Sequence, residues 1–428
     1  MTRQPATAER PDGAGSVPAS ATAAAPGRTA ADAPVPSPFT GLRRAADRAV
    51  TTGLAKVTGA VVAPYQSAVI RIGFTFTWLV FLLREWPHRA ELYGPHSPWG
   101  WDLAHTLIGT NDAFTALMWS SSGVWFQIVY HGAIAASVML LLGWRTRTAS
   151  VLFMIGVLSL QNRSVFMGDG GDNVVHIMSI YLVFTRCGRV WSLDARRARR
   201  LAAAGTTDDR DRTGIALWLL TAAALATVSA LGLLDTGWAV LLWTAQLLPA
   251  VWWLVRRYAP GEPRTVLDMI ANLVHAGAML VVVVEVCLIY STAGWYKIQG
   301  SRWEDGTAVY YPLWLHDFTP WPGLSHLLST SGLMIMLISY GTVIVQVAFP
   351  FTLFNRTVKN VLLVLMMCEH AAIAVVLGLP FFSLAMIAAD AVFLPTGFLR
   401  WVADRAGRLL RVKRRPDPLP GRPSTLVG

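Results

Sequence analysis

The chain has 428 residues, of which 54% are apolar and only 14% are charged. An ordinary soluble domain is about 25% charged, so this composition excludes a typical soluble enzyme. The net charge of +11 is informative only once the positions of the basic residues are known. Cys187, Cys287 and Cys368 lie far apart in the chain, which excludes a disulfide framework and a CxxC metal site.

The hydropathy pattern predicts three regions. Residues 1–60 are expected to form a disordered N-terminal tail and a cytoplasmic lead-in, because the first part is rich in Ala, Pro, Thr and Ser. Residues 61–400 are expected to form a transmembrane domain, and residues 401–428 a basic cytoplasmic tail. The predicted fold class is therefore an all-α, polytopic helical membrane bundle.

Ten apolar segments approach the length of about 20 residues that a helix needs to cross a bilayer. The third, fourth and tenth are the weakest of them. The ten segments cover approximately residues 66–83, 124–142, 149–166, 173–185, 214–233, 237–255, 267–293, 332–354, 360–378 and 380–395.

The distribution of basic residues predicts the orientation of these segments. With the N-terminus inside, 30 of the 36 Lys and Arg residues fall on the cytoplasmic side, five fall outside, and Arg71 lies within the first span. Positive charge next to spans is retained in the cytoplasm. We therefore expect an even number of spans with both termini in the cytoplasm. The same distribution assigns the arginine-rich residues 186–200 to topology and anionic lipid, and argues against nucleic acid as a partner.

Half of the 18 tryptophans lie in two predicted outer segments, which are also rich in Gly and Pro. Aromatic rings of this kind gather at the headgroup level of a membrane. Together the two segments could cover a cavity that opens to the outer face. Their tryptophans are Trp86, Trp99, Trp101, Trp119 and Trp125 in the first, and Trp295, Trp303, Trp314 and Trp321 in the second.

Ionisable side chains inside spans are costly, so each is a functional candidate. Arg71 in the first span could contact a substrate, or could pair with Glu285, Glu369 or Asp390 and fix helix packing. Glu285 and Lys297 are too far apart along one helix for a direct bond, since twelve residues rise about 18 Å. The pair Glu369–His370, with Asp390 on the next segment, fits either a proton path or a packing cluster. A lone histidine such as His131 or His275 is more typical of packing, and no two-histidine metal spacing is present.

The stretch from Gly168 to Asn173 precedes the fourth segment. Asp172 or Asn173 could cap that helix, because a side-chain oxygen there accepts hydrogen bonds from free backbone N–H groups. The alternative is a substrate or ion site, since the glycines Gly168, Gly170 and Gly171 permit an unusual backbone path. Both interpretations stay open.

Lys297 closes the seventh apolar segment, where the chain enters the second outer loop. Its ammonium could simply reach water at the membrane surface while the aliphatic stem stays in lipid. Alternatively, a dry pocket could hold it as a neutral amine that accepts a proton. The shortage of other cations on the outer side favours a functional role.

The residues around Lys297 resemble a known pattern. Tyr290, Ala293–Gly294, Lys297, Trp303, Gly306 and Ala308 follow the order Y-x-x-A-G-x-x-K-x5-W-x-x-G-x-A. This pattern is similar to one in the vitamin K-dependent gamma-carboxylases and the wider horizontally transferred transmembrane (HTTM) domain family. Other segments resemble that family in the same order, over about residues 65–395: Arg71-Ile-Gly73, Gly168 to Asn173, Trp191-Ser-Leu-Asp194 and Phe381-Phe-Ser-Leu.

The resemblance implies a role for several residues. The family's matching lysine deprotonates reduced vitamin K, so Lys297 would be the analogous base. His176 is the residue closest to the family's second active-site group, a histidine after the third span. The resemblance implies a reduced quinone, either menaquinol or vitamin K hydroquinone, as cofactor. It also implies a secreted peptide as a candidate partner. The remaining candidates for substrate contacts are Arg71, Asp172, Asn173, Glu285, Tyr290 and Trp303.

Three function classes follow. The first is a membrane enzyme that acts at the outer face on a quinone or a peptide, with Lys297 as base. The second is a non-catalytic accessory protein for the maturation or export of a secreted peptide. The third is a transporter with Arg71, Glu285 and Asp390 as a charged path. Transporters often contain internal repeats, and no repeat is evident here. In each class the protein is expected in the cell membrane as a multi-pass protein.

Overall fold

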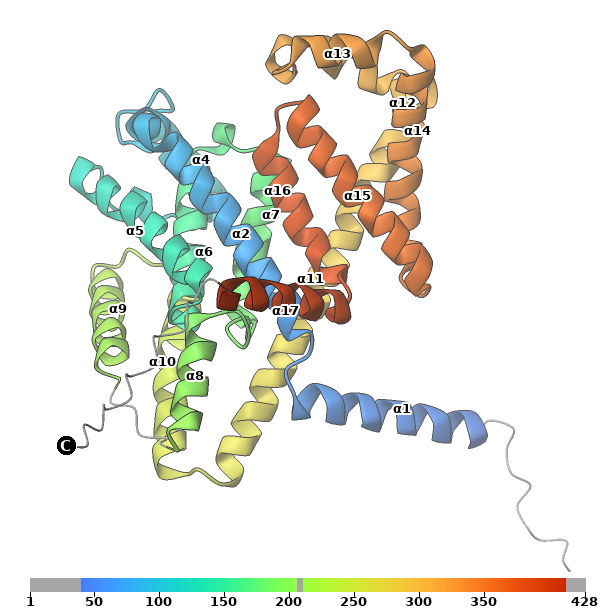
Figure 1. Ribbon diagram of the computed structural model, residues 1–428. Coiled ribbons are helices and arrows are strands. Elements are labelled where there is room, and N and C mark those ends of the chain that lie inside the picture. The colour runs from blue at the N-terminus through green and yellow to red at the C-terminus, as the bar shows by residue number, and fades with distance from the viewer. Residues whose placement is uncertain (1–39, 206–210, 413–428) are drawn as a thin grey trace, which may run out of the picture. The chain divides into compact units, whose positions relative to one another are not determined.

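A computed structural model describes residues 40–205 and 211–412 (Figure 1). The described residues form helices joined by loops, without a β-strand, which confirms the all-helical prediction. The chain divides into two compact units, residues 1–52 and 53–428. The helix α1 (Thr40–Gly59) falls within the region predicted as N-terminal tail and cytoplasmic lead-in. Residues 1–39 of that tail and the end of the basic C-terminal tail lie outside the described residues.

Seven of the ten predicted spans are helices long and apolar enough to cross a membrane. One further candidate is a bent pair of helices. Its first half is α16 (Pro380–Asp390) with η8 (Ala391–Phe393), and its second half is α17 (Thr396–Val412). The two halves meet at an angle of 112°, and they are long and apolar enough to cross a membrane only if they are counted together as one span. The tenth predicted span falls on the first half of this pair. The seven helices are α2 (Pro64–Glu85), α5 (Gly123–Leu142), α9 (Arg212–Ala230), α10 (Thr236–Tyr258), α11 (Glu262–Ile298), α14 (Gly332–Ala348) and α15 (Arg356–Val376).

The third and fourth predicted spans are the helices α6 (Thr146–Arg163) and α7 (Gly170–Phe184). Neither reaches the length and hydropathy of the other seven, since α7 has only 15 residues and α6 carries Arg147 and Arg163. Both helices are nevertheless enclosed: α6 packs against α5 and α7, and α7 packs against α6 and α16. Because neighbouring helices cover them, a long lipid-facing apolar surface is not required.

Helices α2 and α16 pack closely in the middle of the second unit, where large apolar side chains gather. Gly73 of α2 faces Ala388 of α16, and a Cβ atom at Gly73 would lie 2.5 Å from the Ala388 Cβ. Small residues let two helices approach in this way, which is a common device in membrane proteins. This close contact fixes the position of α16 beside α2 and α7.

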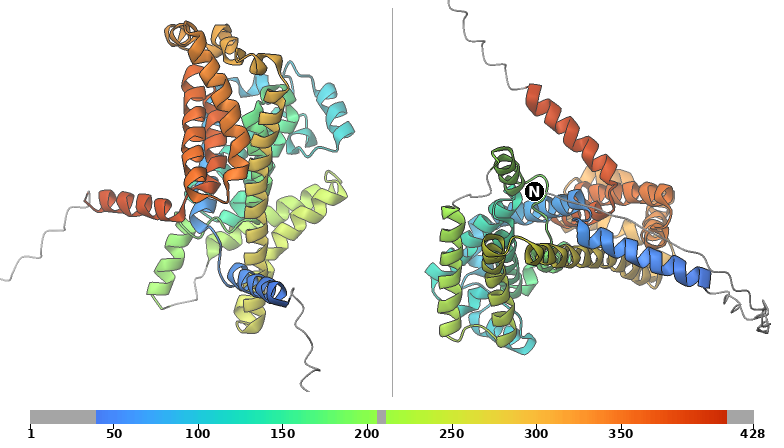
Figure 2. Two further views of the ribbon diagram at one scale, coloured as in Figure 1. Left: turned by 90° about the vertical axis from the view of Figure 1, so that its right-hand side faces the viewer. Right: turned by 90° about the horizontal axis from the view of Figure 1, so that it is seen from below.

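Both tryptophan-rich segments lie at the same end of the second unit, and the basic helix α8 (Leu193–Ala203) lies toward the opposite end (Figures 1 and 2). The first segment contains η1 (Trp86–His88), α3 (Arg89–Tyr93), α4 (Trp101–Asn111) and η2 (Ala116–Trp119). The second contains α12 (Ser301–Glu304), η4 (Ala308–Tyr310), η5 (Pro312–Trp314), η6 (His316–Phe318) and α13 (Pro322–Ser329). The remaining short helices are η3 (Val165–Met167) and η7 (Phe349–Thr352).

Candidate functional site

The N-terminus of α7 is built by a capping box. Asp169 is the N-cap, and its carboxylate accepts hydrogen bonds from the backbone N–H groups of Gly171 and Asp172, at 2.7 and 3.1 Å. The Asp172 carboxylate in turn accepts the backbone N–H of Asp169 at 2.9 Å. The prediction that Asp172 caps this helix end is confirmed in part, because Asp172 accepts a backbone N–H as the N3 residue of the capping box. The N-cap itself is Asp169, and Asn173 has no part in the cap. The cap lies earlier because Asp169 and Asp172 stand three residues apart, the spacing that a capping box needs.

The same end of α7 touches α16 closely. A Cβ atom at Gly171 would lie 2.6 Å from the Phe382 Cα, so only glycine fits at this contact. The sequence Gly168 to Asn173 thus has two structural functions: it caps α7 and it admits the backbone of α16.

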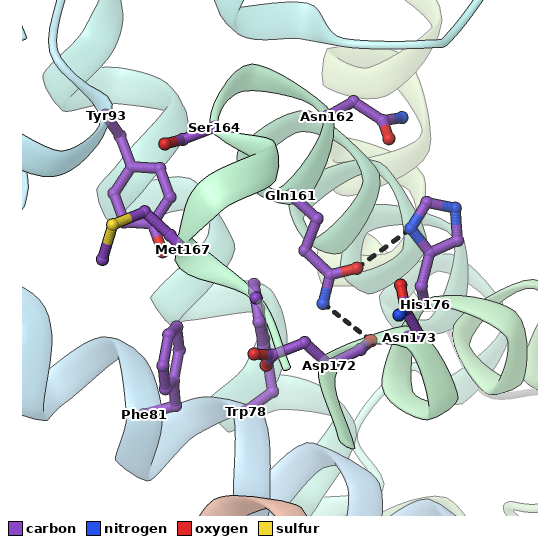
Figure 3. Close-up of a pocket in the computed structure, with 11 residues that line it drawn as sticks. Trp78, Phe81, Tyr93, Gln161, Asn162, Ser164, Met167, Asp172, Asn173 and His176 are labelled. Carbon is purple, nitrogen blue, oxygen red and sulfur yellow. Dashed lines mark hydrogen bonds between the residues drawn. The ribbon is translucent and has the colours of Figure 1, made fainter. Parts of the chain in front are cut away.

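A cavity of about 150 Å³ opens beside this helix end, between α2, α6 and α7 (Figure 3). Three of the predicted site residues, Asp172, Asn173 and His176, line it together. The other lining residues are Trp78, Phe81, Tyr93, Gln161, Asn162, Ser164, Met167 and Gly168.

Hydrogen bonds hold the polar wall of the cavity in place. Gln161 donates from its amide to the backbone carbonyl of Asp172 at 2.9 Å, and its Oε1 lies 2.9 Å from the Nδ1 of His176 (Figure 3). The amide orients the imidazole, because the Gln161 Oε1 accepts the Nδ1–H of that ring. His176 then presents Nε2 as an acceptor.

The opposite wall of the cavity is aromatic. The indole N–H of Trp78 is buried, with 1% of the residue exposed, and has no hydrogen-bond partner among the described residues. A buried donor without a partner is costly. A ligand with a hydrogen-bond acceptor would satisfy it. The sequence analysis missed Trp78 and Gln161; the signal for Gln161 was its place, with Asn162, at the polar end of the third apolar segment.

Lys297 lies in a different cluster, at the end of α11. Its Nζ donates to the Oε1 of Gln346 in α14 at 2.8 Å, and the Gln346 amide donates to the Glu369 carboxylate in α15 at 2.6 Å. The ring of Trp303 lies over the amine, with its centroid 5.3 Å from Nζ. The amine is thus held by a neutral amide and an aromatic ring, and the predicted pair Lys297 and Trp303 is brought together. Lys297 is not among the residues that line the α7 cavity.

Tyr290 belongs to a buried polar network two helical turns before Lys297. Its hydroxyl donates to the Asp390 carboxylate at 2.9 Å and lies 3.0 Å from the Nε2 of His370. Only 1% of Tyr290 is exposed, and Asp390 is fully buried. Within the part of the chain that the structure describes, the second Asp390 oxygen and the Nδ1 of His370 have no hydrogen-bond partner. The predicted proximity of the Glu369–His370 pair to Asp390 is therefore observed for His370, with Tyr290 as the link.

The N-terminal end of α16 separates the α7 cavity from the network of Tyr290, His370 and Asp390. Phe81, which lines the cavity, packs against Phe381 at a ring distance of 5.4 Å. The next residue, Phe382, packs against His370 at 5.5 Å. The Phe381–Phe382 pair thus lies between the two clusters, and the two candidate catalytic residues, His176 and Lys297, are on different sides of it.

Arg71 has a structural environment that the sequence did not indicate. It is fully buried, and its guanidinium donates to the carbonyls of Leu140 and Leu141 at the end of α5, at 2.5 and 2.7 Å, and to that of Trp191 at 2.8 Å. The expected pairing with an acidic residue was wrong. The last carbonyls of a helix have no partner within that helix, and here they are the acceptors that satisfy the arginine.

Glu285 accepts a hydrogen bond from the hydroxyl of Tyr181 in α7 at 3.3 Å. In the part of the chain that the structure describes, the hydrogen bond from the Lys297 amine goes to Gln346 and not to Glu285. Glu285 therefore links α11 to α7, and it lies in neither the cavity nor the Lys297 cluster.

In residues 40–205 and 211–412, no group of three or more His, Cys, Asp and Glu side chains is arranged to hold a metal ion. Comparison with known proteins gave no match: no family model, no curated protein and no solved structure is similar to this chain.

Proposed function

We propose that this protein is a multi-pass protein of the cell membrane, with ten spans and both termini in the cytoplasm. The support is the uneven distribution of basic residues and the position of both tryptophan-rich segments at one end of the second unit. In this proposal α6 and α7 are short spans enclosed by the other helices. The order of motifs supports a relationship to the membrane domain of the HTTM and carboxylase family.

We propose further that the protein is an enzyme that uses Lys297 as a base at the outer face. The observation that carries this proposal is the chain of contacts from Lys297 through Gln346 to Glu369. A general base must be held within reach of the proton that it accepts from the substrate. Gln346 holds the amine, and Glu369 offsets the positive charge that forms when the amine accepts a proton.

The proposed substrate is a reduced quinone such as menaquinol or vitamin K hydroquinone, or a peptide. The ring of Trp303 lies over the amine, and Trp295 and Tyr296, which directly precede Lys297 in α11, are exposed. These residues fit a flat, lipid-soluble ligand at the membrane surface. Lys297 would accept the hydroxyl proton of the quinol, whose anion is the form that reacts with dioxygen. The α7 cavity, with Asp172, Asn173 and His176, lies on the other side of the Phe381–Phe382 pair and is not part of this proposed quinol site.

The test is oxygen uptake by the purified full chain with menaquinol or phylloquinol. Wild type should consume oxygen faster than the quinol alone, and Lys297→Ala should reduce the protein-dependent rate by about a hundredfold, the lower end of the effect of a general base. Lys359→Ala is the matched control, because Lys359 is another part-buried lysine, whose Nζ donates to the Phe393 carbonyl. That variant should keep the wild-type rate.

Two outcomes would contradict the enzyme proposal. Wild type without protein-dependent oxygen uptake would refute its quinone form. Equal loss in the Lys297 and Lys359 variants would show that both act through folding. A secreted peptide that needs the protein for export, but not Lys297, would instead favour the accessory class. Among the described residues, no contact favours a transporter. Arg71 donates to backbone carbonyls, Glu285 bonds to Tyr181 and Asp390 bonds to Tyr290, so the three charged side chains are not hydrogen-bonded to one another.

A further inference from the structure

The helix α8 carries a basic face toward the end of the second unit opposite the tryptophan-rich segments (Figure 1). Its sequence, LDARRARRLAA, contains four arginines. Residues three and four apart share a helix face. Leu193, Arg196, Arg197 and Arg200 therefore lie on one side, whereas Arg199 points elsewhere and donates to the Ala195 carbonyl.

A second cavity, of about 240 Å³, is lined by this face. Three guanidinium groups and one carboxylate surround it, together with an indole ring and a leucine. The lining residues are Trp144, Leu193, Asp194, Arg196, Arg197 and Arg200.

The one carboxylate in the cavity is already bonded. Asp194 accepts hydrogen bonds from the backbone N–H groups of Arg145 and Thr146, and from the Thr146 hydroxyl, at 2.8–2.9 Å. These bonds fix the start of α8 against the start of α6, whose N-cap is Arg145. The carboxylate therefore has little capacity left to compensate the arginines.

The three arginines differ in their partners. Arg197 pairs with Asp211, at 3.2 Å, and this contact fixes its side chain beside the cavity. Within the described ranges, Arg196 and Arg200 form no ion pair. Among the described residues, the cavity thus contains one guanidinium group in an ion pair and two that are not. Planar guanidinium groups bind the oxygens of phosphate through paired hydrogen bonds.

The remaining lining residues select the source of the phosphate. Trp144 and Leu193 are each 37% exposed, so an apolar edge lies directly beside the guanidinium groups. Trp144 follows the spanning helix α5 by two residues, which is the position of interfacial tryptophans at the headgroup level. A free phosphate would gain nothing from this edge, whereas a lipid would place its glycerol and upper acyl carbons there.

We propose that the cavity formed by Trp144, Leu193, Arg196, Arg197 and Arg200 binds the phosphate group of an anionic lipid headgroup. The lipid anchors α8 to the membrane surface beside the end of α5. This site is independent of Lys297 and of the enzyme proposal, and it needs only that the chain lies in a membrane.

The test is native mass spectrometry of the full chain released from detergent micelles, with dioleoylphosphatidylglycerol or dioleoylphosphatidylcholine titrated in. The first phosphatidylglycerol should bind about tenfold more tightly than phosphatidylcholine, a difference that charge-assisted hydrogen bonds readily supply. The double variant Arg196→Gln/Arg200→Gln should lose about the same factor for phosphatidylglycerol and little for phosphatidylcholine. The double variant Arg196→Lys/Arg200→Lys, which keeps the charge but loses the paired geometry, should fall between.

The matched control is Arg199→Gln/Arg257→Gln, which removes two exposed positive charges at residues that do not line the cavity. It should bind phosphatidylglycerol within about twofold of wild type, since exposed charges act weakly at a distance in salt. Equal losses in the two glutamine variants would overturn the proposal, because general positive charge would then explain binding. Displacement of the lipid by millimolar inorganic phosphate would overturn the assignment to a lipid. Wild type without preference between the two lipids would also refute it.

Discussion

Replacement of Gly73 by alanine tests the contact that fixes α16 beside α2. The new Cβ would lie 2.5 Å from the Ala388 Cβ and 3.3 Å from its Cα. Non-bonded carbons are most stable at about 3.5–4.0 Å, so the two helices must separate by about 1 Å. Overpacking of this kind costs about 1–3 kcal/mol. The alanine itself stabilises a helix by about 0.5–1 kcal/mol relative to glycine. At the middle of both ranges, the expected net loss is about 1 kcal/mol in the free energy of unfolding.

The assay is unfolding in mixed micelles of dodecylmaltoside with increasing sodium dodecyl sulfate, followed by tryptophan fluorescence. Gly132→Ala is the matched control, because Gly132 lies inside helix α5 and no heavy atom lies within 4 Å of the position that a Cβ atom would take there. It should unfold at the same or a slightly higher detergent fraction than wild type. The reasoning is refuted if Gly73→Ala is as stable as the Gly132 variant, since α2 and α16 would then not be in close contact.

Three further predictions concern polar contacts. Tyr290→Phe leaves the buried Asp390 and His370 without this partner and should lower the free energy of unfolding by about 1–3 kcal/mol in the same assay. Tyr310→Phe, at an exposed tyrosine, should change it little. Equal effects of the two variants would contradict the buried network. Arg71→Met should lower the yield of folded protein in size-exclusion chromatography more than Arg84→Met, because the carbonyls of Leu140, Leu141 and Trp191 lose a buried donor. Equal yields would argue against a stabilising role for these contacts. Burial raises the pKa of the Asp211 carboxyl, but hydrogen bonds from Arg145, Gly214 and Arg197 outweigh it and lower that pKa to about 2 from 3.8. The stabilisation by Asp211 should therefore be complete above about pH 4 and lost as the pH falls toward 2. The difference in unfolding midpoint between wild type and Asp211→Asn should shrink over that range. A constant difference would contradict the ion pair.

The sequence predicted the helices well because membrane spans carry a strong local signal. Each of the ten apolar segments coincides with at least one helix. The third, fourth and tenth segments gave the weakest apolar signal, and their helices α6, α7 and α16 pack against several other helices. A helix that its neighbours cover does not need a long apolar surface. The bend between α16 and α17 was not predicted, since Pro395 marks a break in the helix but does not set its angle.

The candidate site was predicted in part. Asp172, Asn173 and His176 are close in sequence on one helix, so their shared cavity could be expected. The partners of Lys297 and Arg71 could not. Gln346 is 49 residues from Lys297, and the Arg71 acceptors are backbone carbonyls, which no residue type reveals. Contacts of this kind depend on how the helices pack, and single-sequence patterns do not determine that packing.

The most direct measurement for the central claim is product analysis after the purified protein reacts with phylloquinol and oxygen. The account predicts that wild type forms the quinone epoxide and that Lys297→Ala yields only the quinone produced by autoxidation. Formation of epoxide by the Lys297 variant at the wild-type rate, or its absence with wild type, would contradict the assignment of Lys297 as the base.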